Sequence, residues 1–129
     1  MKKILIIMTF LASSLFAQMN WIGDLEDAYD NVETNKKIIM VMLSQKGCPP
    51  CKYMKSIVFK DDKVIKEFNK SFLAVELDIH EDAVPLELEN FGTPTFYFLN
   101  ADEEILGRFV GYKNEKDFLD ELDTVLMLE

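Results

Sequence analysis

Two cysteines three residues apart are the side chains of this sequence best suited to chemistry. Cys48 and Cys51 enclose Pro49 and Pro50, and the chain has no other cysteine. A disulfide that closes such a short loop gains little stability from chain entropy. A neighbouring pair of thiols can instead form and break its disulfide by exchange with another molecule. The spacing therefore predicts a redox-active pair and not a structural cross-link.

The two cysteines have different predicted roles. A helix predicted from residue 49 confines both prolines to its first turn, where helices tolerate proline. Cys48 then stands at the helix N-terminus, where free N–H groups and the helix dipole favour negative charge and lower the thiol pKa below ~8.5. Cys48 is the predicted nucleophile. Cys51, one turn further in, is predicted to resolve the mixed disulfide that Cys48 forms with a substrate.

A metal site is the alternative use for these two sulfurs. A structural zinc ion needs four nitrogen or sulfur ligands, and the chain offers only Cys48, Cys51 and His80. Its nearby methionines fall at positions that the hydrophobic pattern assigns to the core, which explains them better than metal binding. We therefore expect no metal and no cofactor.

Hydrophobic spacing predicts the elements that hold the cysteine pair. Helices are predicted over residues 24–35 and 49–59, after Asp61 or Asp62, and after Asn114. Strands are predicted over residues 38–43, 72–79, 95–99 and 105–110, with a short irregular or helical segment around 85–90. Strands separated by helices should be parallel, and the last two strands should form an antiparallel hairpin. The predicted class is α/β, with one mixed sheet flanked by helices.

These motifs in this order resemble the thioredoxin superfamily. The cysteine motif begins a helix after a buried strand, Gly92-Thr93-Pro94-Thr95 precedes a later strand, and Gly111 follows the last strand. The resemblance covers about residues 21–128 and is closest to exported thioredoxin-related proteins. It implies a thioredoxin-like fold, with a central mixed sheet flanked by helices and the dithiol at the tip of the first core strand.

The resemblance also implies which residues contact the substrate. In the superfamily the proline that matches Pro94 is cis and lies against the dithiol, and the backbone that matches Thr93 pairs with the bound substrate strand. Pro49 and Pro50, inside the motif, complete the expected substrate-binding set. The alternative for Pro94 is an ordinary trans proline that opens an edge strand.

Two departures from the superfamily pattern bear on the mechanism. Cytoplasmic thioredoxins carry a buried aspartate six residues before the first cysteine, as the acid–base group of the resolving thiol, and this chain has Met42 there. They carry a lysine on the neighbouring strand, where this chain has Glu76. A carboxylate is unexpected in a central parallel strand, so Glu76 is predicted to be buried with a raised pKa and to accept the proton of Cys51. The alternative is a solvated glutamate near the strand end.

The first 17 residues are predicted to be a signal peptide. Lys2 and Lys3 form a short basic region, residues 4–11 are apolar, and Ala17 supplies the small residue before the cleavage point. Cleavage would leave residues 18–129 as one thioredoxin-like domain. The alternative is a retained anchor, although a spanning helix wants roughly 20 apolar residues. Export predicts a periplasmic protein, soluble after cleavage, in a compartment where thiols are normally oxidised.

The charge of the chain limits its partners. The chain has 23 Asp and Glu residues against 14 Lys and Arg residues, a net charge of -9, which disfavours nucleic acid and anionic lipid. The expected partners are client proteins with disulfides or dithiols and a thiol electron carrier in the membrane. The expected oligomeric state is a monomer.

The redox direction follows from the surroundings of the thiolate. The two prolines carry no charge and remove two N–H donors, and acidic surroundings raise a thiol pKa. These features favour a reductant of client disulfides. A disulfide-forming oxidant and a non-catalytic peptide-binding module of the same fold stay open as alternatives.

Overall fold

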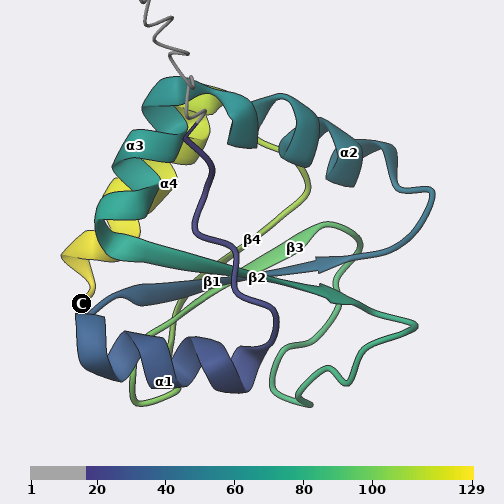
Figure 1. Cartoon of the computed structure of the whole chain (residues 1–129). Coiled ribbons are helices and arrows are strands. Elements are labelled where there is room, and N and C mark those ends of the chain that lie inside the picture. The colour runs from purple at the N-terminus through teal and green to yellow at the C-terminus, as the bar shows by residue number, and fades with distance from the viewer. Residues whose placement is uncertain (1–16) are drawn as a thin grey trace, which may run out of the picture.

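The computed structural model describes residues 17–129, so the predicted signal peptide, apart from Ala17, lies outside the described residues. Within this range one sheet is covered by helices on both faces (Figure 1). The elements are α1 (Leu25–Asn35), β1 (Ile38–Ser44), α2 (Pro49–Ser56), the short 3-10 helix η1 (Val58–Lys60), α3 (Asp62–Ser71), β2 (Phe72–Asp78), β3 (Thr95–Leu99), β4 (Ile105–Val110) and α4 (Glu115–Met127). The predicted α/β class is confirmed.

The strands lie in the order β2-β1-β3-β4. β1 is parallel to β2 and antiparallel to β3, and β3 and β4 form an antiparallel pair. The parallel and antiparallel pairings agree with the prediction, whereas the central position assumed for the strand of Glu76 is wrong. β2 is an edge strand: among residues 17–129 its partners are β1 and, through a short bridge to Ala74, Trp21.

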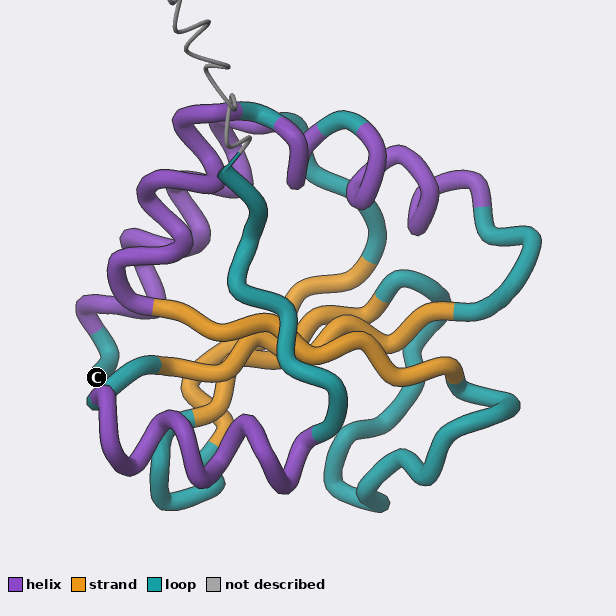
Figure 2. The backbone as a smooth tube through the Cα atoms, in the orientation of Figure 1, coloured by secondary structure: helices purple, strands orange, loops and turns teal. Residues whose placement is uncertain are grey.

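The two faces of the sheet carry two separate apolar cores. α1 covers one face, and α2, α3 and α4 cover the other (Figure 2). Every residue of β1 is buried, because a central strand with helices on both sides has no solvent-facing side. Met40 and Met42 point into the core under α2–α4, and Val41 points into the core over α1. The methionines are therefore packing residues, as expected.

The helix starts follow side-chain capping. Asp61 Oδ1 accepts the N–H of Val64 at 3.0 Å, and Asn114 Oδ1 accepts the N–H of Asp117 at 2.8 Å, which satisfies backbone donors that the first turn leaves free. Asp61, not Asp62, is thus the cap of α3. The predicted helix over 49–59 is shorter than expected, because the chain turns through η1 and buries Val58 and Phe59. Residues 85–90 form no helix.

Candidate active site

The cysteine motif follows directly from the central strand. β1 ends at Ser44, and a three-residue loop leads to Cys48 at the start of α2. Gly47 in this loop has a φ of 70°, a left-handed conformation that glycine adopts without strain and larger residues rarely do. A Cβ at this position would meet no atom within 4 Å. The glycine at position 47 is therefore explained by backbone conformation and not by lack of space for a Cβ.

Cys48 and Cys51 form a disulfide with a Cα–Cα distance of 5.3 Å. Cys48 is the N-cap of α2, and its Sγ accepts the N–H of Cys51 at 3.2 Å. Pro49 and Pro50 have no N–H, so the N–H of Cys51 is the first backbone donor of the helix. Cys48 is 9% exposed and Cys51 is 2% exposed. The two sulfurs are therefore inequivalent in both access and hydrogen bonding.

A groove of about 780 Å³ runs beside the disulfide, and we call it the dithiol groove. Its lining residues come from the loop after β1, from α2 and from η1: Gln45, Lys46, Gly47, Cys48, Pro49, Cys51, Lys52, Lys55, Ser56 and Lys60. This lining contains four lysines and no carboxylate. The expectation of acidic surroundings for the thiols is therefore wrong, because the acidic residues of the chain are concentrated elsewhere.

The sequence indicates the basic character of this groove locally, although the net charge of the whole chain is negative. Residues 34–60 contain six lysines and no aspartate or glutamate. The structure folds the second half of this stretch around the disulfide. Charge counted along the chain, rather than summed over it, would have predicted the lysines of the groove.

The loop that carries Thr93 and Pro94 lies beside the end of β1. Leu43, next to the last residue of β1, pairs with Thr95, the first residue of β3. Pro94 directly precedes Thr95, so it lies near the end of β1, where the motif loop begins. The Thr93–Pro94 peptide bond is cis. Pro94 is buried, and its carbonyl accepts the N–H of Gly111 at 2.8 Å. The topology thus brings two of the expected substrate-binding residues, Thr93 and Pro94, to the end of β1 from which the motif loop begins.

Two residues that sequence reasoning did not assign to the site connect its loops. Gln45 Nε2 donates to Thr93 Oγ1 at 3.0 Å, and Gln45 Oε1 lies 3.1 Å from Nε2 of His80. The backbone N–H of His80 donates to Asp78 Oδ1 at 2.8 Å, and this bond, followed by the N–H of Glu81, lowers the pKa of Asp78. Gln45, in the loop after β1, thus contacts both the loop after β2 and the segment that contains Thr93. Only its place at the end of a buried strand hinted at this in the sequence.

Glu76 lies on the face of β2 that turns toward α2. It pairs with Met42 in the sheet register, so it neighbours the residue that occupies the position of the missing aspartate. Its side chain is 33% exposed, and its Oε2 lies 2.8 Å from Lys55 Nζ, at ion-pair distance but without hydrogen-bond geometry. The predicted burial of Glu76 holds only for its Oε2 atom, which is buried, because β2 is an edge strand and leaves the rest of the side chain partly exposed. Its structural link to the dithiol groove is Lys55, which lines that groove.

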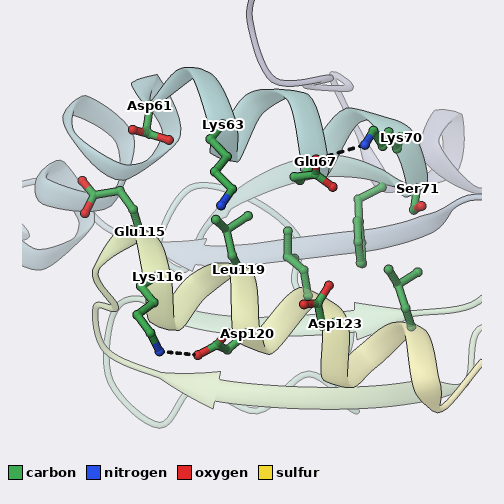
Figure 3. A pocket seen from close by; sticks show the side chains of 13 residues that line it. Asp61, Lys63, Glu67, Lys70, Ser71, Glu115, Lys116, Leu119, Asp120 and Asp123 are labelled. Carbon is green, nitrogen blue, oxygen red and sulfur yellow. Dashed lines mark hydrogen bonds and ion pairs between the residues drawn. The ribbon is translucent and has the colours of Figure 1, made fainter.

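A second groove of about 690 Å³ lies between α3 and α4, and we call it the α3–α4 groove. Leu119 forms part of its apolar floor, and charged side chains from both helices stand around it (Figure 3). Glu67 pairs with Lys70 at 3.0 Å, and Lys116 pairs with Asp120 at 3.0 Å. Half of the charged residues that line this groove are therefore paired within it.

Residues 17–129 contain neither a candidate metal site nor a candidate membrane-spanning helix. No three His, Cys, Asp or Glu side chains of this range come together as a metal site would require. No helix of the described part of the chain has the length and apolar character needed to cross a bilayer.

The fold and the disulfide at the start of α2 define a domain of the thioredoxin-like class. The chain belongs to the family described as thioredoxin-like domain, which matches residues 25–126.

Three known proteins illustrate this relationship. The thiol:disulfide interchange protein DsbD of Campylobacter jejuni is 23% identical over 120 residues, which are 89% of this chain and 21% of that protein. Thioredoxin H4 of Arabidopsis thaliana is 30% identical over 87 residues, 67% of this chain and 70% of that one. The structure of a thioredoxin from Thermus thermophilus superposes with a TM-score of 0.72 at 25% identity, over 84% of this chain and 88% of that one. The chain thus spans about a fifth of the length of DsbD.

Proposed function

We propose that Cys48 is the nucleophile and Cys51 the resolving thiol of a disulfide-exchange reaction with client proteins. The observation that carries this proposal is the inequivalence of the two sulfurs. The Cys48 sulfur accepts the first free N–H of α2, so negative charge is stabilised there after reduction. Cys51 is nearly inaccessible, so a protein-sized client reaches Cys48 first.

The proposed reaction moves two electrons from the protein to the client. The thiolate of Cys48 attacks one sulfur of a client disulfide, forms a mixed disulfide and releases the other client sulfur as a thiolate. Cys51 then loses its proton and attacks the Cys48 sulfur. This step releases the second client thiolate and forms the Cys48–Cys51 disulfide, and the two client thiolates take up protons.

The proposed client-binding surface consists of Pro49, Pro50, Thr93 and Pro94. Thr93 is half-buried and Pro49 is exposed, so an extended client segment has access to both sides of the motif. The bond from Gln45 to the Thr93 hydroxyl leaves the Thr93 backbone free to pair with a client strand. We also propose that Glu76 accepts the proton of Cys51. Its carboxylate is held in an ion pair with Lys55.

We propose that the protein acts as a reductant. The Cys48 sulfur accepts a single N–H, because the two prolines supply none. A weakly stabilised thiolate favours the donation of electrons. The lysines of the groove act in the opposite sense, but they are exposed, so solvent and salt screen them more than they screen the N–H.

We propose export to the periplasm, cleavage after Ala17, a monomeric state and a membrane thiol carrier as the electron donor. Contacts of the fold begin directly after this cleavage point, since Asn69 Nδ2 donates to the carbonyl of Gln18 at 2.8 Å and Met19 is buried. The likeness to part of DsbD, a thiol:disulfide interchange protein, supports the choice of partners. N-terminal sequencing of the protein from a periplasmic fraction should find Gln18 as the first residue.

Reduction of insulin disulfides tests the function as a whole. The parent protein, supplied with a dithiol reductant, should accelerate insulin reduction, and Cys48→Ser should not. In the Cys51→Ser variant, mixed disulfides with clients should accumulate, because the resolving step is missing. A parent protein that binds unfolded client but leaves its disulfides intact would instead be a binding module.

A further inference from the structure

The dithiol groove is basic in a protein that is acidic overall. Four of the 14 basic residues of the chain line it, and none of the 23 acidic residues does. The remaining ten basic residues are shared among the other surfaces and the N-terminal region. The sign of charge next to the disulfide is therefore opposite to the sign of the whole molecule.

Two of the four lysines have no ionic partner in the described residues. Lys46 pairs with Glu81 at 2.6 Å and Lys55 pairs with Glu76 at 2.8 Å. Lys52 and Lys60 form no ion pair within residues 17–129. The groove thus presents at least two uncompensated positive charges beside the reactive sulfur.

The lysines come from chain segments before and after the disulfide. Lys46 precedes the motif in the loop after β1, and Lys52 follows Cys51 directly in α2. Lys60 lies in η1, which follows α2, and also lines the groove. All of these lysines are exposed, so their ammonium groups are free to meet a molecule that docks over Cys48.

We propose that the dithiol groove selects redox partners whose reactive cysteine lies in an acidic segment. This inference rests on the proposed exchange at Cys48. Carboxylates on both sides of the partner cysteine would face Lys52 and Lys60 while the cysteine meets Cys48. The charge of -9 on the whole chain repels a long polyanion, so the partner is a short acidic stretch of protein and not nucleic acid. Exposed charges of this kind act mainly on the association rate and lose their effect in salt.

The test compares three short peptides that differ only in the residues around one cysteine. Glutamate, glutamine or lysine flanks a cysteine that forms a mixed disulfide with 2-mercaptoethanol, and the neutral hydroxyethyl disulfide serves as a small reference. The second-order rate at which each compound oxidises the reduced protein is measured by acid quenching and mass spectrometry. At low ionic strength the acidic peptide should react about tenfold faster than the glutamine peptide, and the lysine peptide should react more slowly than both.

The Lys52→Glu/Lys60→Glu variant replaces the two uncompensated positive charges of the groove with negative charges. Its preference for the acidic peptide should vanish or reverse when each rate is divided by the rate with hydroxyethyl disulfide, which corrects for any change in Cys48 reactivity. The matched control is Lys63→Glu/Lys66→Glu, which makes the same change of charge at two exposed positions of α3 outside the dithiol groove. The control should keep the parent preference.

The outcomes separate this inference from the function on which it rests. If hydroxyethyl disulfide fails to oxidise the pair, or oxidises Cys48→Ser at the parent rate, the proposed function itself is wrong. If that reaction proceeds through Cys48 while the three peptides react at equal rates, the acidic partner is wrong and the function stands. A preference that survives in Lys52→Glu/Lys60→Glu likewise overturns the assignment to this groove.

Discussion

The dithiol groove and the α3–α4 groove are similar in size, but the net charges of their lining residues have opposite signs. Their volumes are about 780 and 690 Å³. The α3–α4 groove is lined by three lysines and five carboxylates, and two of these lysines pair with carboxylates of the same lining, Lys70 with Glu67 on α3 and Lys116 with Asp120 on α4 (Figure 3). The dithiol groove is lined by four lysines whose only partners, Glu81 and Glu76, lie outside its lining.

The ion pairs of the α3–α4 groove shift the pKa values of two of its residues. In the α3–α4 groove, the hydrogen bond from Lys70 lowers the pKa of Glu67, and the hydrogen bond to Asp120 raises the pKa of Lys116. In each of these two pairs, the partner stabilises the charged form of the group whose pKa is shifted. Volume alone therefore does not identify a functional groove. Charge that is not compensated, next to a group that can react, distinguishes the dithiol groove from the other.

The largest expected effect comes from removal of the Cys48 sulfur. Cys48→Ser should lower insulin reduction to the uncatalysed rate, because serine forms no mixed disulfide. The control is Asp123→Ser, an exposed position of α4 in the α3–α4 groove. That variant should keep the parent rate. Residual activity in Cys48→Ser would mean that Cys51 attacks clients directly and that the two sulfurs have been assigned in the wrong order.

A second prediction concerns the inequivalence of the two thiols in the reduced protein. Iodoacetamide should modify Cys48 at least about tenfold faster than Cys51, since thiolate character and exposure both control the rate. Peptide mapping after a short, quenched reaction measures the ratio. In 6 M guanidinium chloride the two rates should converge, because unfolding removes both the N–H contact to the Cys48 sulfur and the burial of Cys51. Equal rates in the native protein would contradict the proposed roles.

The third prediction separates two roles for Glu76. Glu76→Gln should leave the first attack by Cys48 unchanged, slow the resolving step a few-fold and flatten its dependence on pH, if the carboxylate accepts the Cys51 proton. Stopped-flow mixing with a client peptide resolves the two steps. Lys55→Gln is the matched variant, because it breaks the same ion pair and keeps the carboxylate. If both variants slow resolution equally, Glu76 acts by positioning Lys55 and transfers no proton.

Much of the fold was predictable because the pattern of this sequence is locally consistent. β1 is an unbroken apolar run, and the structure buries it completely. β3 and β4 have the predicted bounds, and Asn114 caps α4 as predicted. The edge position of β2 was missed, because helices cover both faces of the sheet, so apolar residues such as Val75 and Leu77 fit an edge strand as well as a central one. The carboxylate of Glu76 was the feature of the sequence that indicated an edge strand.

The site was only partly predictable, for a different reason. The motif identified Cys48 and Cys51, since residues three apart on a helix start are necessarily close. Gln45 and Thr93 are 48 residues apart in sequence, and no local pattern indicates that their side chains meet. The α3–α4 groove itself depends on tertiary contact, because α3 and α4 pack together only in the folded chain, although its two ion pairs are local to each helix.

The smallest expected effect belongs to the α3–α4 groove and concerns stability at acid pH. Because Lys70 lowers the pKa of Glu67 in the folded state, the pair stabilises the fold above the ordinary glutamate pKa, and this contribution is lost as the pH falls through the lowered value. The thermal unfolding midpoints of the parent and of Glu67→Gln should therefore differ slightly at about pH 6 and converge toward about pH 3. The difference should also disappear in about 1 M salt, since the pair is exposed. Insulin reduction by Glu67→Gln should equal that of the parent, because charges that are paired within their own groove have no contact with the disulfide. A loss of activity in this variant would mean that the α3–α4 groove takes part in client binding, and the contrast between the two grooves would no longer hold.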